Sequence, residues 1–367
     1  MKKQRIQNLV KPSINKISKY IPGESKILGN KKIIKLSSNE SPFKLPKSLF
    51  SKLKIVLEKS NLYPDGDSRL LKKTISEVFK LNSNQIICGN GSDDILSVIC
   101  QTFAREKGEV ICNEFGFIYY PIISRAAGAE VIIAKSNGVS ISCDNILKKI
   151  SNKTNLIFLA NPNNPTGSII FRDELEYFIN KIPKNIILVL DGAYSEFIVD
   201  KNYTDGLDLV RKFPNLIITR TFSKIFALAG LRLGWAYSNK EIIDLLEKVR
   251  GPFNVNSIAQ TMGSIILRDK KFLKKSIDHN LKWQKKLPKI INEIGLQAFE
   301  THTNFVLVKV DKRKFNKKKI IEGLLKKRII VRELNNYGLK DYFRISIGTN
   351  EELYYFIKVL KALVKKN

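Results

Sequence analysis

Short apolar runs alternate with helical or loop-like stretches from residue 85 to residue 237. Seven of them predict strands, at residues 85–88, 110–112, 131–134, 156–159, 186–190, 216–219 and 233–237. Strands that are apolar throughout indicate a sheet covered on both faces, and the intervening helices indicate that it is largely parallel. The pattern therefore predicts an α/β fold with ligands at the carboxyl ends of the strands.

The hydrophobic pattern changes after a helix predicted at 239–250, which ends at Gly251 and Pro252. Beyond it we expect helices near 257–267 and within 272–293, strands at 304–309, 329–332 and 342–347, and a C-terminal helix. Residues 1–35 show no sustained period and read as an extended arm that needs a partner surface. The predicted organisation is an arm (1–35), a large domain (36–252) and a small α+β domain (253–367), and a length of 367 residues suits two packed units.

The net charge of +30 raises the question of a nucleic-acid or acidic-membrane partner. The lysines are scattered over predicted helices and turns, and the densest basic clusters, 312–319 and 326–328, contain one aromatic residue, Phe315, and not the interleaved stacking aromatics of a single-strand binder. We therefore expect a solvated basic surface, with no nucleic-acid or membrane partner. The four cysteines show no metal-ligand spacing and no run is long enough to span a membrane, so a cytoplasmic protein without a metal site is expected.

Candidate chemistry centres on the stretch from Thr219 to Trp235, which lies between two predicted strands. Lys224 is surrounded there by apolar and small residues, which favour its neutral amine and allow it to form a Schiff base with an aldehyde. Thr221, Ser223 and Arg232 offer donors suited to a phosphate. The residues alone leave open that Lys224 is one more surface lysine.

The sequence TFSKIFALAGLRLGW resembles the cofactor-lysine signature of fold-type I pyridoxal 5′-phosphate (PLP) enzymes, and more narrowly that of histidinol-phosphate aminotransferases. Segments 20–23, 38–42, 250–256, 303–308 and 330–334 also resemble that family, so the resemblance covers nearly the whole chain. It implies fold type I, with PLP carried by Lys224 as a Schiff base, an amino donor and a 2-oxo acid as substrates, and a homodimer.

By the same resemblance, further residues take cofactor roles. Gly91, Ser92 and Asp93, between a strand and a helix, help to hold the phosphate, although they could be an ordinary turn. Phe117 stacks on the pyridine ring, with Phe115 as a rival and a core position as the alternative.

The cofactor set is completed by three residues that follow the predicted strands 156–159 and 186–190, namely Asn164, Asp191 and Tyr194. Asn164 and Tyr194 contact the phenolic oxygen, although the residues around Asn164 could merely form a turn. Asp191 pairs with the pyridine nitrogen, because a carboxylate after an apolar strand is costly without a partner; a helix cap is the alternative.

The resemblance also places substrate residues. Arg344 clamps an α-carboxylate, although it could be a surface residue, Tyr20 and Arg332 bind a substrate phosphate, and Asn39 belongs to the substrate side. Tyr63 reaches the cofactor phosphate of the partner subunit.

The implied reaction converts histidinol phosphate and 2-oxoglutarate into imidazole acetol phosphate and glutamate. A threonine-phosphate decarboxylase or an aromatic aminotransferase of the same fold stays open, as does, from another class, a basic nucleic-acid-binding protein. A catalytically silent PLP-binding regulator is disfavoured, because no helix-turn-helix extension is visible.

Overall fold

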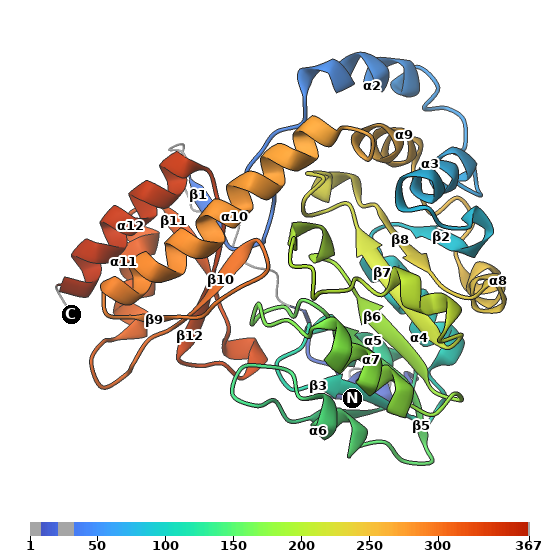
Figure 1. The fold of residues 1–367 in the computed structure, drawn as a ribbon, viewed down its shortest axis with the longest axis horizontal. Helices are drawn as coiled ribbons and strands as arrows, with labels where there is room; N and C mark the ends of the chain where they lie inside the picture. Colours follow the sequence, from blue (N-terminus) through green and yellow to red (C-terminus); the bar gives the residue numbers. More distant parts are fainter. Residues whose placement is uncertain (1–8, 21–32, 366–367) are drawn as a thin grey trace.

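A seven-stranded sheet forms the centre of the larger unit in the computed structural model, which describes residues 9–20 and 33–365 (Figure 1). Its strands are β2 (Ile86–Gly89), β3 (Glu109–Asn113), β4 (Glu130–Ala134), β5 (Thr154–Ala160), β6 (Ile187–Asp191), β7 (Leu216–Thr221) and β8 (Gly234–Tyr237). They lie in the order β2-β8-β7-β6-β5-β3-β4, and β8 runs antiparallel to both of its neighbours. All seven predicted strands are confirmed, with small shifts at their ends.

Helices cover both faces of this sheet, as apolar strands require. One face packs against α4 (Ser92–Phe103), α5 (Tyr119–Ala126) and α8 (Lys240–Val249). The other packs against α3 (Arg69–Phe79), α6 (Cys143–Leu147), α7 (Arg172–Lys181) and α9 (Ser257–Ile266). Neighbouring residues of a strand alternate between the two cores: Val110 and Cys112 join the first, and Ile111 joins the second.

The smaller unit contains a five-stranded sheet in the order β1-β11-β12-β10-β9. Its strands are β1 (Ile34–Leu36), β9 (Gln297–Ala298), β10 (Phe305–Lys309), β11 (Ile329–Glu333) and β12 (Tyr342–Ser346). A separate core joins them to α10 (Lys270–Glu293), α11 (Lys317–Lys326) and α12 (Asn350–Lys365). The sequence pattern predicted three of these strands and missed β1 and β9, which are too short to show a period.

Helix α10 bridges the two cores. Phe272, near its start, packs with the core of the large sheet, as do Ala259 and Met262 of α9, whereas Trp283 and Leu287 pack in the core of the small sheet. Figure 1 shows α10 running from the small sheet up to α9. The boundaries predicted at residues 35 and 252 stay a prediction.

The remaining described elements are short. They are α2 (Phe50–Leu57) and the 3-10 turns η1 (Pro12–Lys16), η2 (Lys47–Leu49), η3 (Ser83–Gln85), η4 (Ser195–Phe197), η5 (Leu207–Arg211), η6 (Ala229–Leu231) and η7 (Asn335–Tyr337). Within the predicted arm, η1 lies against α5 of the same chain, and residues 1–8 and 21–32 lie outside the described residues.

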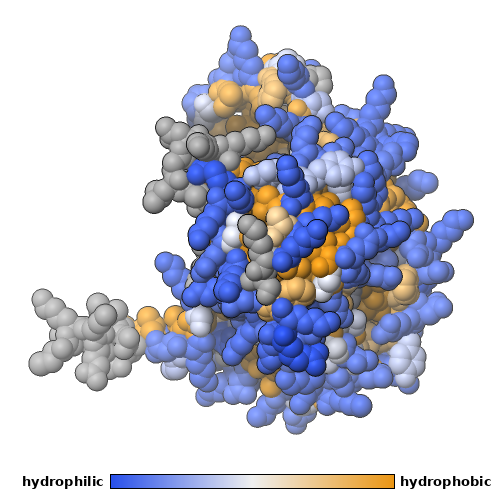
Figure 2. Space-filling view, turned by 90° about the vertical axis from the view of Figure 1, so that its left-hand side faces the viewer, coloured by the Kyte–Doolittle hydropathy of each residue, from blue (hydrophilic) through white to orange (hydrophobic). Residues whose placement is uncertain are grey.

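The surface is largely polar, as expected for a chain in which 27% of the residues are charged. The face shown in Figure 2 is mostly hydrophilic, with separate hydrophobic areas, one of them at the height of α2 in Figure 1. Among residues 9–20 and 33–365, no helix is both long and apolar enough to cross a membrane.

Candidate active site

A cavity of about 260 Å³ lies where the carboxyl ends of β5, β6 and β7 face the small sheet. Fourteen of the residues singled out from the sequence line it: Tyr20, Asn39, Ser92, Asp93, Phe117, Asn164, Asp191, Tyr194, Thr221, Ser223, Lys224, Arg232, Arg332 and Arg344. They come from both units of the fold, so the site depends on how the two units pack together.

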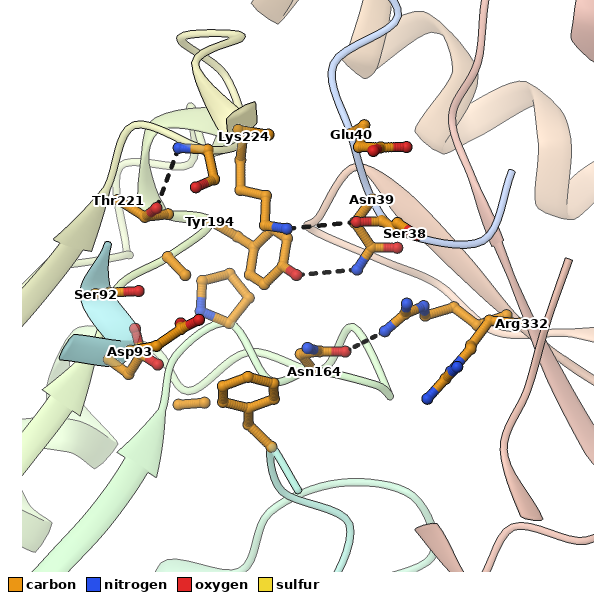
Figure 3. A pocket seen from close by; sticks show the side chains of 18 of the residues that line it. Ser38, Asn39, Glu40, Ser92, Asp93, Asn164, Tyr194, Thr221, Lys224 and Arg332 are labelled. Atoms are coloured by element: carbon orange, nitrogen blue, oxygen red, sulfur yellow. Dashed lines mark hydrogen bonds between the residues drawn. The ribbon is translucent and has the colours of Figure 1, made fainter. Parts of the chain in front are cut away.

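Lys224 follows β7 and extends its amine into this cavity, toward Tyr194 and the segment after β1 (Figure 3). Its Nζ atom lies 3.5 Å from the carbonyl oxygen of Ser38 and 5.8 Å from the centre of the Tyr194 ring. Burial, together with the charge of Arg344, lowers the pKa of Lys224 to about 8. The amine is therefore far more often neutral near physiological pH than an ordinary lysine, as a nucleophile or general base must be.

Asp191, the last residue of β6, is buried at the floor of the cavity. One carboxylate oxygen accepts a hydrogen bond from the Tyr120 hydroxyl at 2.7 Å, and the other accepts one from the Thr219 hydroxyl at 3.1 Å. Burial raises the pKa of Asp191, and these two hydrogen bonds oppose the rise. Both donors are neutral, so a cation placed next to this carboxylate would be strongly favoured.

Sequence reasoning missed Tyr120 and Thr219. Thr219 lies directly opposite Asp191 in the β6–β7 ladder, and Tyr120, in the first turn of α5, comes three residues after Phe117. Pairing the two predicted strands in register would have found Thr219.

The beginning of α4 forms the polar end of the cavity. Gly91 precedes the helix with φ +92°, and a side chain there would place its Cβ 2.5 Å from Nη2 of Arg232. Arg232 donates to Ser223 Oγ at 3.2 Å and to the Asp93 carboxylate at 3.3 Å. The Asp93 carboxylate would repel an anion, so its side chain orients Arg232, and anion binding falls to the free helix N–H groups, Ser92, Ser223 and Arg232.

Thr221 has a local structural role in this region. Its Oγ1 accepts a hydrogen bond from the backbone N–H of Ser223 at 3.1 Å, which fixes the turn leading to Lys224 (Figure 3).

Phe117 forms one wall of the cavity. Its ring lies edge-on to the Tyr120 ring, with 5.5 Å between the ring centroids. Its rival Phe115 packs instead against the cluster of Leu307, Leu334 and Leu339. The structure therefore brings Phe117, and not Phe115, to the site.

Asn164 and Tyr194 face the middle of the cavity from the loops that follow β5 and β6 (Figure 3). Asn164 accepts a hydrogen bond from Arg344, and the Tyr194 hydroxyl accepts one from the Asn39 amide at 2.9 Å. Both side chains are thus oriented by residues that the sequence assigned to the substrate side.

Two arginines reach the cavity from the small sheet. Arg332 of β11 and Arg344 of β12 are direct partners in the antiparallel ladder. Arg344 is buried, donates to the Ser37 carbonyl oxygen at 3.0 Å, and has its pKa lowered by burial. Like charges opposite each other in a ladder are unfavourable, so this arrangement favours an anionic ligand. Tyr337 also lines this end, and no sequence motif pointed to it.

Two predicted site residues, Gly91 and Tyr63, do not line this cavity. Gly91 directly precedes Ser92, which does, whereas Tyr63 is on the surface. It is 82% exposed, and its ring stacks on Phe253 with 4.6 Å between the centroids.

The cysteines and histidines offer no rival centre. Cys88, Cys100, Cys112 and Cys143 are all buried and unpaired, and burial raises the pKa of Cys88 and Cys100 to about 12. Over the part of the chain that the structure describes, no group of three or more histidine, cysteine or acidic residues is placed to hold a metal ion.

This donor set fits PLP. The positive end of α4, with Ser223 and Arg232, suits its phosphate, Phe117 offers a flat wall for the ring, and the buried Asp191 suits a protonated pyridine nitrogen. The amine of Lys224, whose pKa is lowered to about 8, lies in the same cavity.

Comparison with known proteins agrees with the fold. The family model described as "Aminotransferase class I and II" matches residues 31–360. The chain belongs to this aminotransferase family.

Individual relatives and a solved structure show a more specific similarity, to histidinol-phosphate aminotransferases. The chain is 40% identical over 352 residues to the histidinol-phosphate aminotransferase of Pelagibacter ubique, covering 95% of this chain and 97% of that protein. It is 38% identical to histidinol-phosphate aminotransferase 2 of Pasteurella multocida, covering 97% and 98%. The crystal structure of the Clostridium acetobutylicum histidinol-phosphate aminotransferase is 26% identical with a TM-score of 0.84, covering 91% of this chain and all of that one.

Proposed function

We propose that the protein is a PLP-dependent aminotransferase that exchanges an amino group between histidinol phosphate and 2-oxoglutarate, giving imidazole acetol phosphate and glutamate. The observation that carries this proposal is the pairing of Arg332 and Arg344 at the end of a cavity that also contains Lys224 and Asp191. The full-length similarity to histidinol-phosphate aminotransferases supports the choice of substrate.

Each group of the site has a task in this reaction. PLP, when bound, supplies an aldehyde that reacts with amines and a ring that accepts electrons from the substrate carbon. The Asp191 carboxylate stabilises positive charge on the ring nitrogen, and Asn164 and Tyr194 orient the ring through its phenolic oxygen. Lys224, with a pKa of about 8, would remove the proton from the carbon that carries the substrate amine. It would then return the proton to the former aldehyde carbon of the cofactor.

The two arginines explain how one site accepts two different substrates in turn. Histidinol phosphate carries a phosphate and no α-carboxylate, whereas glutamate carries carboxylates and no phosphate. Arg344 is buried beside Asn164, close to the reacting groups, and we assign it to the α-carboxylate. Arg332 and Tyr20 line the same end and are assigned to the phosphate.

Half-reaction spectra test this proposal. The purified protein, loaded with PLP, is mixed in turn with histidinol phosphate, glutamate, an aromatic amino acid and threonine phosphate, and the cofactor absorbance is followed. We expect conversion with histidinol phosphate and glutamate. Carbon dioxide released from threonine phosphate would instead mean a decarboxylase, and conversion with aromatic amino acids alone would mean an aromatic aminotransferase.

Arg332→Ala should weaken histidinol phosphate binding about tenfold to a hundredfold, because it removes charge-assisted hydrogen bonds to the phosphate. Aromatic amino acids, which lack the phosphate, should be affected much less. Single-turnover titration with both kinds of donor measures the difference, and Arg313→Ala, which removes an exposed arginine of the same unit, is the matched control. Equal losses for both donors would mean that Arg332 is structural.

A homodimer is part of the proposal. Tyr63 lies outside the cavity of its own chain and is exposed. Other large hydrophobic residues from the same part of the sequence are exposed as well: Phe50, Ile55, Leu57, Leu62 and Leu70. Exposed hydrophobic residues of this kind are typical of a subunit interface, and we infer that a second copy covers them and receives Tyr63 at its own cavity.

Mixing two inactive variants tests the dimer. A heterodimer of Lys224→Ala and Tyr63→Ala contains one site with both native residues, so the equimolar mixture should regain up to about one-quarter of wild-type activity after subunit exchange. Light scattering gives the oligomeric state. A monomer, or a mixture no more active than its components, would contradict the role of Tyr63 across the interface.

A further inference from the structure

A cluster of buried polar side chains surrounds Arg220 of β7, outside the cavity. Arg220 of β7 is 1% exposed, and its guanidinium lies 2.5 Å from the Asp205 carboxylate and 3.3 Å from that of Glu196. It also donates to the carbonyl oxygen of Gly192 at 3.4 Å. None of these residues lines the cavity, and the proposed chemistry uses none of them.

Tyr203 joins this cluster to both of the loops that carry Asn164 and Tyr194. Its hydroxyl donates to the carbonyl oxygen of Asn161 at 2.8 Å and lies 2.8 Å from Ser195 Oγ. A phenol has one proton, which goes to Asn161, so Ser195 is the donor in the second contact. One hydroxyl therefore connects the loop after β5 to the turn after β6.

The position of Tyr203 is itself fixed by the arginine. Asp205, two residues further along the same loop, is held by Arg220, and Glu196, which follows Ser195, is held from the other side of the guanidinium. Burial raises the pKa of Glu196, so its ionised form is costly there, and the charge of Arg220 offsets part of that cost. A buried set of charges contributes little to stability compared with apolar packing, and its best-supported use is to specify one geometry.

Gly192 shows how closely these parts fit. A Cβ atom at this position would lie 2.6 Å from Ser195 Oγ and 3.2 Å from Cδ of Arg220. The turn between Asp191 and Tyr194 can therefore approach the arginine only because residue 192 has no side chain.

We propose that Tyr203 is a positioning residue, which locks the loops of Asn164 and Tyr194 at a fixed separation so that both side chains meet the same cofactor oxygen. This inference rests on the proposed function. It concerns one hydroxyl that lies outside the cavity and touches neither cofactor nor substrate.

Tyr203→Phe tests the proposal, since it removes only the hydroxyl. We expect kcat to fall about three- to tenfold in both half-reactions, the effect of one lost hydrogen bond, while KM for each substrate stays unchanged. In the cofactor-free protein, hydrogen–deuterium exchange should become faster in residues 161–168 and 192–198 and stay unchanged elsewhere. Ser195→Ala should change the same two segments in the same direction.

Tyr177→Phe is the matched control, because Tyr177 is 56% exposed on α7 and takes part in none of the contacts of Tyr203. A variant Tyr203→Phe that lowers the melting temperature but leaves kcat and the exchange of both loops unchanged would overturn the proposal. If the wild-type protein converts none of the amino donors, the proposed function fails, and the exchange measurement still reports on the loops.

Discussion

Lys224→Ala should fold normally, bind PLP without a covalent link, and lose transamination by at least about 10²- to 10⁴-fold, the range expected for removing a general base alone. The physical reason lies in the environment of the amine. Burial keeps the pKa of Lys224 near 8, and Nζ faces the cavity rather than solvent. Borohydride reduction of the wild-type protein with PLP, followed by peptide mapping, should place the label on Lys224.

The abundance of lysine makes this a demanding test, because the chain offers many other amines. Lys274→Ala removes an exposed lysine, paired with Asp278, and should leave both labelling and turnover unchanged. A reductive label on any lysine other than Lys224 would contradict the assignment, as would full turnover of Lys224→Ala.

Asp191→Asn should retain PLP and its covalent link to Lys224 but lose activity by about 10²- to 10³-fold, as when one preorganised electrostatic contact is removed from an active site. Asparagine preserves the shape and can still accept from Tyr120 through its oxygen. It cannot carry the negative charge that stabilises a protonated ring nitrogen, so the ring becomes a poorer electron acceptor.

Turnover and the ¹⁵N chemical shift of labelled PLP measure the two consequences separately. The shift should report an unprotonated ring nitrogen in Asp191→Asn and a protonated one in the wild type. Asp278→Asn, at an exposed position, serves as the control. Near-normal turnover, or a nitrogen that stays protonated in Asp191→Asn, would show that the carboxylate has another role.

The large sheet could be predicted because each of its strands is a continuous apolar run between polar breaks. β1 and β9 could not, since strands of three and two residues show no period. The predicted division into units stays a prediction; α10 is one uninterrupted helix whose two ends pack in different cores.

The candidate site could be located from the sequence where a residue stands at the end of a strand, as Asp191 does in β6, because strand ends converge at one edge of a sheet. Sequence analysis did not find Tyr120 and Tyr337, because they reach the cavity from a helix and a turn whose positions are set only by tertiary packing. The choice between Phe115 and Phe117 depended on the direction of the backbone after β3, which two phenylalanines in one loop do not reveal.

The pairing of β1 with β11 has a consequence for how the protein folds. Ile34 lies opposite Ile329, so a strand made early in synthesis finds its neighbour only when almost the whole chain has been made. Contacts between such distant parts of a sequence form slowly, because a long loop must close first. Ser37, which follows β1, and Arg344, beside β11, meet through this closure. The substrate end of the cavity is therefore expected to be among the last parts of the molecule to form, after the large sheet has folded.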